Sequence, residues 1–159
     1  MRKAMQKTLF VITVIGCFAY AHSAQAKQPG SVDFLNSGKV LPKSLPFSEA
    51  VRVDNTLYLS GQIGVVPGTL ELVPGGVKEE TRQTMENIKT SLEANGYTMR
   101  DVVKCSVMLA DISDWAAFNE IYRTFFSGRY PARSAFATNG LALGAHVEIE
   151  CVAALGRQG

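Results

Sequence analysis

The segment from Asp101 to Ala110, DVVKCSVMLA, constrains the possible folds of this chain more than any other stretch. Apolar side chains at every second position from Val103 to Leu109 alternate with others such as Lys104, which is the pattern of a half-buried β-strand. Helical patterns occur on both sides of this strand. The sequence therefore predicts an α+β fold, with helices packed against a sheet.

The helix before this strand is predicted over about residues 79–95. Met85, Ile88 and Leu92 recur there at helical spacing, and Gly96 suits the position that follows a helix end.

The helix after the strand is predicted to begin at Ser113, a suitable N-cap, and to stop before Gly128. One face of it is strongly aromatic. The residues of this face are Trp115, Phe118, Tyr122, Phe125 and Phe126.

Four more strands are expected. Two short ones, at 50–53 and 56–61, are joined by Asp54-Asn55, a two-residue hairpin turn whose residues tolerate positive φ. Two others close the chain, at about 132–138 and 146–154. The predicted order is ββαβαββ in a single domain, with both helices covering one face of a mixed sheet.

Composition indicates a globular domain and argues against a nucleic-acid-binding protein. The 159 residues suffice for one ordinary domain, and 47% hydrophobic with 19% charged residues is typical of a globular protein. The net charge is only +2, and no basic stripe is interleaved with aromatic residues, so no nucleic-acid partner is expected.

The first 26 residues have the organisation of a signal peptide. Arg2, Lys3 and Lys7 precede an apolar run at 9–21, and the small residues of Ala24-Gln25-Ala26 follow it. The apolar run is shorter than the ~18 residues of a transmembrane span, so none is expected. We expect cleavage after Ala26 and export to the periplasm.

A second interpretation of the N-terminus stays open. The VIGC segment, Val14–Cys17, resembles a bacterial lipobox, which would leave a lipoprotein anchored at Cys17. Residues 27–44, with scattered Gly, Ser, Pro and Lys, are expected to be a mobile leader, and residues 45–159 the folded domain.

Two cysteines follow the expected cleavage site. Cys105 and Cys151 lie in strand-like runs and could form a disulfide in an exported protein if their strands are neighbours. Two buried apolar thiols are the alternative, and the one we expect. His146 stands alone, so no metal site is expected.

Three charged residues stand out in the closing strands. Arg133 precedes a largely apolar run, and Glu148 and Glu150 point to the same face of their strand. Surface ion pairs would explain them, and so would a site in which a guanidinium binds a substrate carboxylate while a glutamate handles water. The residues alone leave both explanations open.

Four stretches between Leu45 and Leu155 resemble the reactive intermediate deaminase family, also called RidA or YjgF. YLSGQIG resembles a strand of that family that ends in Ser-Gly-Gln, YPARS its arginine motif, and VEIECVA its closing strand. The long stretch from Thr81 to Tyr122 resembles its helix, strand and second helix almost position by position.

This resemblance implies a chorismate-mutase-like α+β fold that assembles as a homotrimer, with sites at the subunit clefts. It implies hydrolysis of 2-imino or 2-enamino acids to 2-keto acids with release of ammonia, without a cofactor. Val51, Val53, Val103 and Val107 are candidates for the sheet surface buried in such a trimer.

The resemblance also implies roles for individual residues. Arg133 would bind the substrate carboxylate, and Glu148 would orient or activate water, whereas Glu150 receives no role. The positions that match pocket residues of the family are Phe47, Ser60, Gly61, Asn119 and Ala135.

Two of these positions depart from the family pattern. Phe47 lies where many members have tyrosine, and Ala135 where many have cysteine, so a hydroxyl and a thiol are missing. The departures leave room for a non-catalytic carboxylate-binding or holdase-like protein as the alternative. A ribonuclease, an activity ascribed to some relatives, is disfavoured by the lack of a basic patch.

Overall fold

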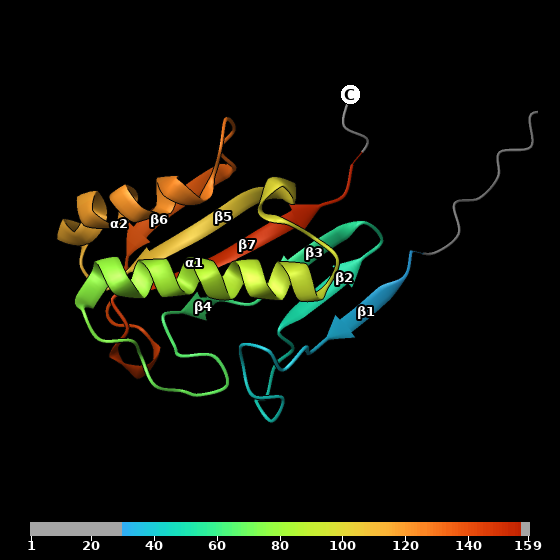
Figure 1. Cartoon of the computed structure of the whole chain (residues 1–159), viewed down its shortest axis with the longest axis horizontal. Coiled ribbons are helices and arrows are strands. Elements are labelled where there is room, and N and C mark those ends of the chain that lie inside the picture. The colour runs from blue at the N-terminus through green and yellow to red at the C-terminus, as the bar shows by residue number, and fades with distance from the viewer. Residues whose placement is uncertain (1–29, 157–159) are drawn as a thin grey trace, which may run out of the picture.

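The computed structural model describes residues 30–156, so the expected signal peptide at 1–26 and the lipobox cysteine Cys17 lie outside the described residues. Nine helices and strands carry the fold, linked by short 3₁₀ turns (Figure 1). The strands are β1 (Val32–Leu35), β2 (Ala50–Val53), β3 (Thr56–Leu59), β4 (Gln62–Ile63), β5 (Val102–Leu109), β6 (Ala132–Ala137) and β7 (Val147–Ala154), and the helices are α1 (Gly76–Ala94) and α2 (Trp115–Tyr122).

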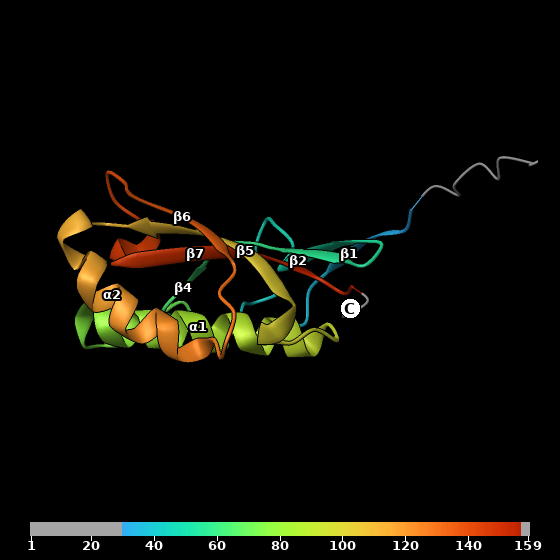
Figure 2. The same cartoon turned by 90° about the horizontal axis from the view of Figure 1, so that it is seen from above.

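All strands belong to one mixed sheet in the order β1-β2-β3-β7-β5-β6, with β4 also pairing to β7. Every pairing is antiparallel except that of β5 with β6. A parallel pair needs a crossover connection, which α2 supplies between β5 and β6. Figure 2 shows both helices on the same side of the sheet, as the α+β interpretation predicted.

The core lies between this sheet and α1. Met85, Ile88 and Leu92, the helical repeat seen in the sequence, are fully buried in it. They pack with inward-facing residues of β5 and β7 such as Val107 and Ile149, which are also fully buried. Gly96, just after α1, has a φ of +83°, a left-handed conformation that favours glycine.

The segment before residue 45 corrects the prediction of a mobile leader. In the described part of that segment, β1 forms four antiparallel pairs with β2, and Val40 and Leu41 are buried. Glu49 also holds this segment, because its carboxylate accepts hydrogen bonds from the Ser37 amide (2.7 Å) and hydroxyl (2.6 Å). The folded unit therefore begins before residue 45.

The second helix starts later and ends earlier than predicted. The capping residue is Asp111 and not Ser113. The Asp111 side chain accepts a hydrogen bond from the backbone amide of Ser113, at 2.8 Å, and so caps a 3₁₀ turn at Ile112–Asp114. The α-helix then ends at Tyr122 in a second 3₁₀ turn, Arg123–Phe125, and does not reach Gly128.

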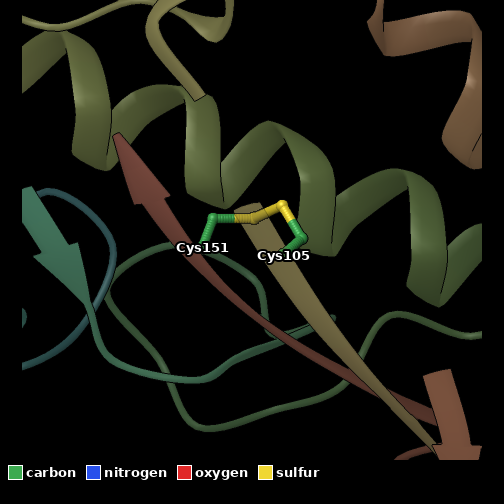
Figure 3. The surroundings of a disulfide bond; sticks show 2 residues. All are labelled: Cys105 and Cys151. Atoms are coloured by element: carbon green, nitrogen blue, oxygen red, sulfur yellow. A yellow bond between two sulfur atoms is a disulfide. The ribbon is translucent and has the colours of Figure 1, made fainter. Parts of the chain in front are cut away.

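The two cysteines form a disulfide, so the expectation of free thiols is wrong. Cys105 on β5 and Cys151 on β7 are directly opposed in the antiparallel register, with their Cα atoms 4.2 Å apart. Both are buried beneath α1, as Figure 3 shows. Alternation in the sequence indicates that both side chains face inward. It does not indicate that β5 pairs with β7, because these strands are far apart in the chain.

Candidate active site

Arg133 lies on β6, at the edge of the sheet, beneath α2. Its Nη1 donates a hydrogen bond to Oδ1 of Asn119, at 2.7 Å, and the Asn119 amide in turn donates to the carbonyl of Trp115 at 2.8 Å. Two residues that the family resemblance placed in one pocket are therefore in direct contact. The remaining donors of the Arg133 guanidinium have no hydrogen-bond partner within residues 30–156.

Aromatic rings from α2 surround the guanidinium. Its central carbon lies 4.8 Å from the ring centre of Tyr122, 5.2 Å from that of Trp115 and 5.5 Å from that of Phe118. Cation–π attraction and these fixed rings orient the Arg133 side chain. The sequence revealed the aromatic face of this helix but gave no sign that an arginine would pack on it.

The Tyr122 hydroxyl belongs to this environment as a neutral group. Burial raises the pKa of Tyr122 to about 12, and the nearby charge of Arg133 only partly opposes that rise. Tyr122 is therefore uncharged across the physiological range, and does not neutralise the guanidinium.

Glu148 lies in a different environment, on β7 beside β4. Its carboxylate lies against the α-carbon of Gly61, where the β-carbon of any other residue would collide with Oε1. Gly61 thus leaves the space in which the carboxylate sits, and the structure brings together two residues that the family resemblance assigned to the site.

The pKa of Glu148 is raised above its ordinary value of 4.5, mainly by burial, with a further contribution from the like charge of Glu150. A carboxylate with a raised pKa is a stronger base than one in free solution. Glu150, for which the sequence suggested no role, therefore acts on Glu148 through its charge.

Ser60 and Phe47 lie on neighbouring segments. The Ser60 hydroxyl donates to the carbonyl of Ser48 (2.7 Å), and its amide donates to the carbonyl of Glu49 (3.0 Å). Phe47, next in the chain to Ser48, is 48% exposed. The hydroxyl of Ser60 is therefore already engaged with the segment that carries Phe47.

Sequence reasoning missed Glu49, which organises this segment. Its side chain is buried and accepts hydrogen bonds from Ser91 on α1 and from Ser37, while its amide donates to Asn36 at 2.9 Å. No cation pairs with this carboxylate within the described part of the chain. A single glutamate in a polar loop gives no sequence signal of such burial.

Arg133 and Glu148 lie on opposite faces of the sheet. On β5, Cys105 is paired with Arg133 of the neighbouring strand β6 and with Cys151 of the other neighbouring strand, β7. Paired residues point to the same face of a sheet, so all three side chains lie on the face that carries the helices. Glu148 precedes Cys151 by three residues on β7 and therefore points to the uncovered face. Ala135, two residues after Arg133, lies on the helix face opposite Val107.

A cavity of about 420 Å³ opens beside the guanidinium of Arg133. It is separate from Glu148, which does not line it. The residues that line it are Asn119, Tyr122, Arg123, Tyr130, Pro131 and Arg133.

Residues 30–156 contain neither a metal-binding cluster nor a membrane-spanning helix. No group of three or more His, Cys, Asp or Glu side chains is arranged to hold a metal ion there. Among the helices of that part of the chain, none combines the length and the apolar character needed to cross a bilayer.

Comparison with known proteins identifies the family. The family model described as endoribonuclease L-PSP matches residues 39–155, which include every candidate site residue. The chain belongs to this family. Its match to the endoribonuclease L-PSP family spans the sheet from β2 to β7 and both helices, so the predicted fold is confirmed.

Curated members of the endoribonuclease L-PSP family carry the name of a deaminase. The chain is 48% identical over 111 residues to the 2-iminobutanoate/2-iminopropanoate deaminase of Mus musculus, covering 70% of this chain and 82% of that protein. It is 43% identical over 131 residues to the human protein of the same name, covering 82% and 87%.

Solved structures of the family share the architecture. RidA from Psychrobacter sp. PAMC 21119 is 41% identical and superimposes with a TM-score of 0.73 over 77% of this chain and 99% of that one. TdcF from E. coli, solved with bound serine, is 30% identical with a TM-score of 0.73 over 78% and 99%.

Proposed function

We propose that this protein hydrolyses 2-imino acids, and their 2-enamino tautomers, to 2-keto acids with release of ammonia. The observation that carries the proposal is Arg133, fixed by Asn119 and three aromatic rings, with unpaired donors beside an open cavity. Relatives at 43–48% identity bear the name of this activity. Serine, the molecule bound to TdcF, also carries a carboxylate that a guanidinium can bind.

The chemistry requires two functions from the protein. Arg133 binds the carboxylate of the substrate through a bidentate fork and so fixes the adjacent imine carbon. Glu148 accepts a proton from the water whose oxygen adds to that carbon. Glu148 returns this proton to the nitrogen, which gives an amino alcohol. The hydroxyl proton of the amino alcohol then passes to the nitrogen as the carbon–nitrogen bond breaks, so the oxygen becomes the keto group and the nitrogen leaves as ammonia.

The reaction proceeds in this way without a cofactor. The carbon of a 2-imino acid is already electrophilic, so holding it beside an oriented water removes much of the barrier. Ser60, Gly61, Phe47 and Ala135 complete the pocket in this proposal.

We propose that more than one copy of the chain completes the site, in a homotrimer with sites at the subunit clefts. Support comes from the opposite faces on which Arg133 and Glu148 lie, because one copy can then supply the arginine and its neighbour the glutamate. Symmetric rings formed through such head-to-tail contacts are a common form of assembly.

The uncovered face of the sheet supports the same assembly. Phe34, Val51, Tyr58 and Val152 lie directly opposite one another on successive strands and form an apolar row across this face. A contiguous exposed apolar surface marks an interaction site. Val51 and Val53 are therefore suitable interface residues, as the sequence suggested, whereas Val107 faces the helices and is fully buried.

The disulfide supports export to an oxidising compartment, which we propose is the periplasm. Disulfides are rare where cytosolic reductants keep thiols reduced. A signal peptide cleaved after Ala26 would deliver the described domain there, with a lipid anchor at Cys17 as the alternative.

A non-catalytic carboxylate-binding protein is the second candidate. It is favoured by Phe47 and Ala135, which lack the hydroxyl and the thiol that many relatives carry at these positions. Such a protein would bind 2-keto acids through Arg133 without turning over their imines.

The decisive experiment uses 2-iminopropanoate generated in the cuvette from alanine by an amino-acid oxidase. The mature protein should accelerate loss of the imine and formation of pyruvate and ammonia. Binding of pyruvate without any acceleration would favour the carboxylate-binding alternative, and cleavage of RNA in a parallel incubation would favour the ribonuclease.

A further inference from the structure

The cavity beside Arg133 contains a second guanidinium, that of Arg123. Six residues line this cavity, and two of them are arginines, while none is an aspartate or a glutamate. A substrate with a single carboxylate would therefore leave one of the two positive charges without a partner.

The position of Arg123 follows from the helix that carries it. Arg123 comes four residues after Asn119, at the end of α2, so both lie on the same side of the helix one turn apart. Asn119 is itself in contact with Arg133 at 2.7 Å. Arg123 is thus one helical turn from the point where the substrate carboxylate is expected.

Arg123 is not engaged elsewhere. It is exposed and makes no side-chain hydrogen bond or ion pair with any residue from 30 to 156. Glu120 lies one turn earlier on α2, and its carboxylate is paired with Lys78, whose Nζ lies 2.6 Å from Oε2. Lys78 is the main cause of the lowered pKa of Glu120, and the charge of Arg123 makes only a smaller contribution. The Arg123 guanidinium remains available to a ligand.

We propose that Arg123 binds a second carboxylate, so that the preferred substrates are 2-imino acids with an acidic side chain, of the kind derived from aspartate or glutamate. This inference rests on the proposed deaminase function. In it, Arg133 binds the carboxylate next to the imine carbon and Arg123 binds the carboxylate at the far end of the substrate.

Two features of the cavity fit this class of ligand. Its volume of about 420 Å³ accommodates a molecule of four or five carbon atoms with room for water. Tyr130, which is 64% exposed, also lines this cavity and carries a hydroxyl group. Charge-assisted hydrogen bonds from a planar guanidinium would favour a carboxylate there over an apolar side chain.

The test compares two substrates on three proteins. Imines of alanine and of glutamate are generated by suitable oxidases, and kcat/KM is measured for wild type, Arg123→Gln and Arg129→Gln. Arg129 is an exposed arginine close in the chain that does not line this cavity, so its variant controls for the loss of one positive charge.

Wild type should prefer the dicarboxylic imino acid, and Arg123→Gln should lower the ratio of dicarboxylic to monocarboxylic kcat/KM about tenfold or more, the scale of one lost charge-assisted hydrogen bond. The Arg129→Gln ratio should match that of wild type. An unchanged ratio in Arg123→Gln, or an equal loss on both substrates, would overturn the proposal.

A binding measurement separates this inference from the deaminase function. Calorimetric titration with 2-oxoglutarate and with 2-oxobutanoate needs no turnover, and tighter binding of 2-oxoglutarate that depends on Arg123 is expected. If the protein hydrolyses the alanine imine but binds both keto acids equally, the deaminase function stands and the second carboxylate site is wrong. If no imine is hydrolysed but 2-oxoglutarate binds through Arg123, the second carboxylate site stands and the deaminase function is wrong.

Discussion

The carboxylate of Glu148 occupies the space that a side chain at Gly61 would fill. Replacing Gly61 with alanine should therefore push the carboxylate from its place while leaving the core intact. Misplacement of a catalytic group by about 1 Å can lower turnover roughly 10²-fold, and a loss of that order is expected. Imine hydrolysis and circular dichroism together check this prediction; full activity in a folded Gly61→Ala protein would remove Glu148 from the reaction.

Arg133 should not tolerate replacement by lysine. Arg133→Ala should abolish turnover, and Arg133→Lys should remain about 10²-fold below wild type, because it keeps the charge but loses two charge-assisted hydrogen bonds of a planar fork. Steady-state kinetics on both variants, with thermal unfolding to verify the fold, provide the measurement. A lysine variant close to wild type would mean that charge alone suffices.

Glu148→Gln should depress turnover by about 10²–10⁴-fold, the usual contribution of a general base. The raised pKa of Glu148 means that the active carboxylate form is reached only above the ordinary value of 4.5, so kcat/KM should fall on the acid side at a higher pH than for a free glutamate. Glu150→Gln removes a like charge and should move this acid limb to lower pH with a much milder loss of activity. A pH profile of kcat/KM measures the shift, and an unmoved or upward-shifted limb would contradict it.

The disulfide should contribute substantially to stability. Cys105 and Cys151 are 46 residues apart, and closing a loop of that length stabilises the folded state by about 4 kcal/mol in the chain-entropy model. Urea unfolding of wild type, with and without reductant, should show this loss, and the double variant Cys105→Ala/Cys151→Ala should be insensitive to reductant. Equal midpoints for oxidised and reduced wild type would show that the crosslink has little effect.

Mixing two inactive variants should restore activity if sites are shared between subunits. Arg133→Ala and Glu148→Gln, denatured together and refolded at equal concentrations, should recover about a quarter of wild-type activity, since each site of a cyclic trimer draws one residue from each of two neighbours. Sedimentation of the mixture checks the assembly. A stable monomer, or no recovery in a mixed trimer, would place both residues in one chain.

The sequence predicted the elements whose pattern is local. Period-two alternation identified β5, and the spacing of Met85, Ile88 and Leu92 identified α1, because each pattern reports burial of one side of its own segment. Strand β1 was missed because its four residues stand among Gly, Ser and Lys, and only pairing with β2 orders them. Two-residue β4 is too short to show any alternation.

Only part of the candidate site could likewise be predicted from the sequence. Residue types suggested a carboxylate-binding arginine and a glutamate, and the family resemblance supplied Asn119 and Gly61. The aromatic rings around Arg133, the buried Glu49 and the disulfide were not predicted, because each joins segments far apart in the chain. The opposite faces of Arg133 and Glu148 likewise depend on the strand register, which a single sequence does not give.

Glu49 has a practical consequence for anyone who shortens this protein. The family match starts at residue 39, which invites a truncation there. Such a truncation would delete Ser37 and leave a buried carboxylate with Ser91 as its remaining side-chain donor. It would also remove β1, so that β2 would become an unpaired edge strand that can pair with other chains. The smallest fragment that keeps β2 paired on both sides therefore starts ahead of Val32.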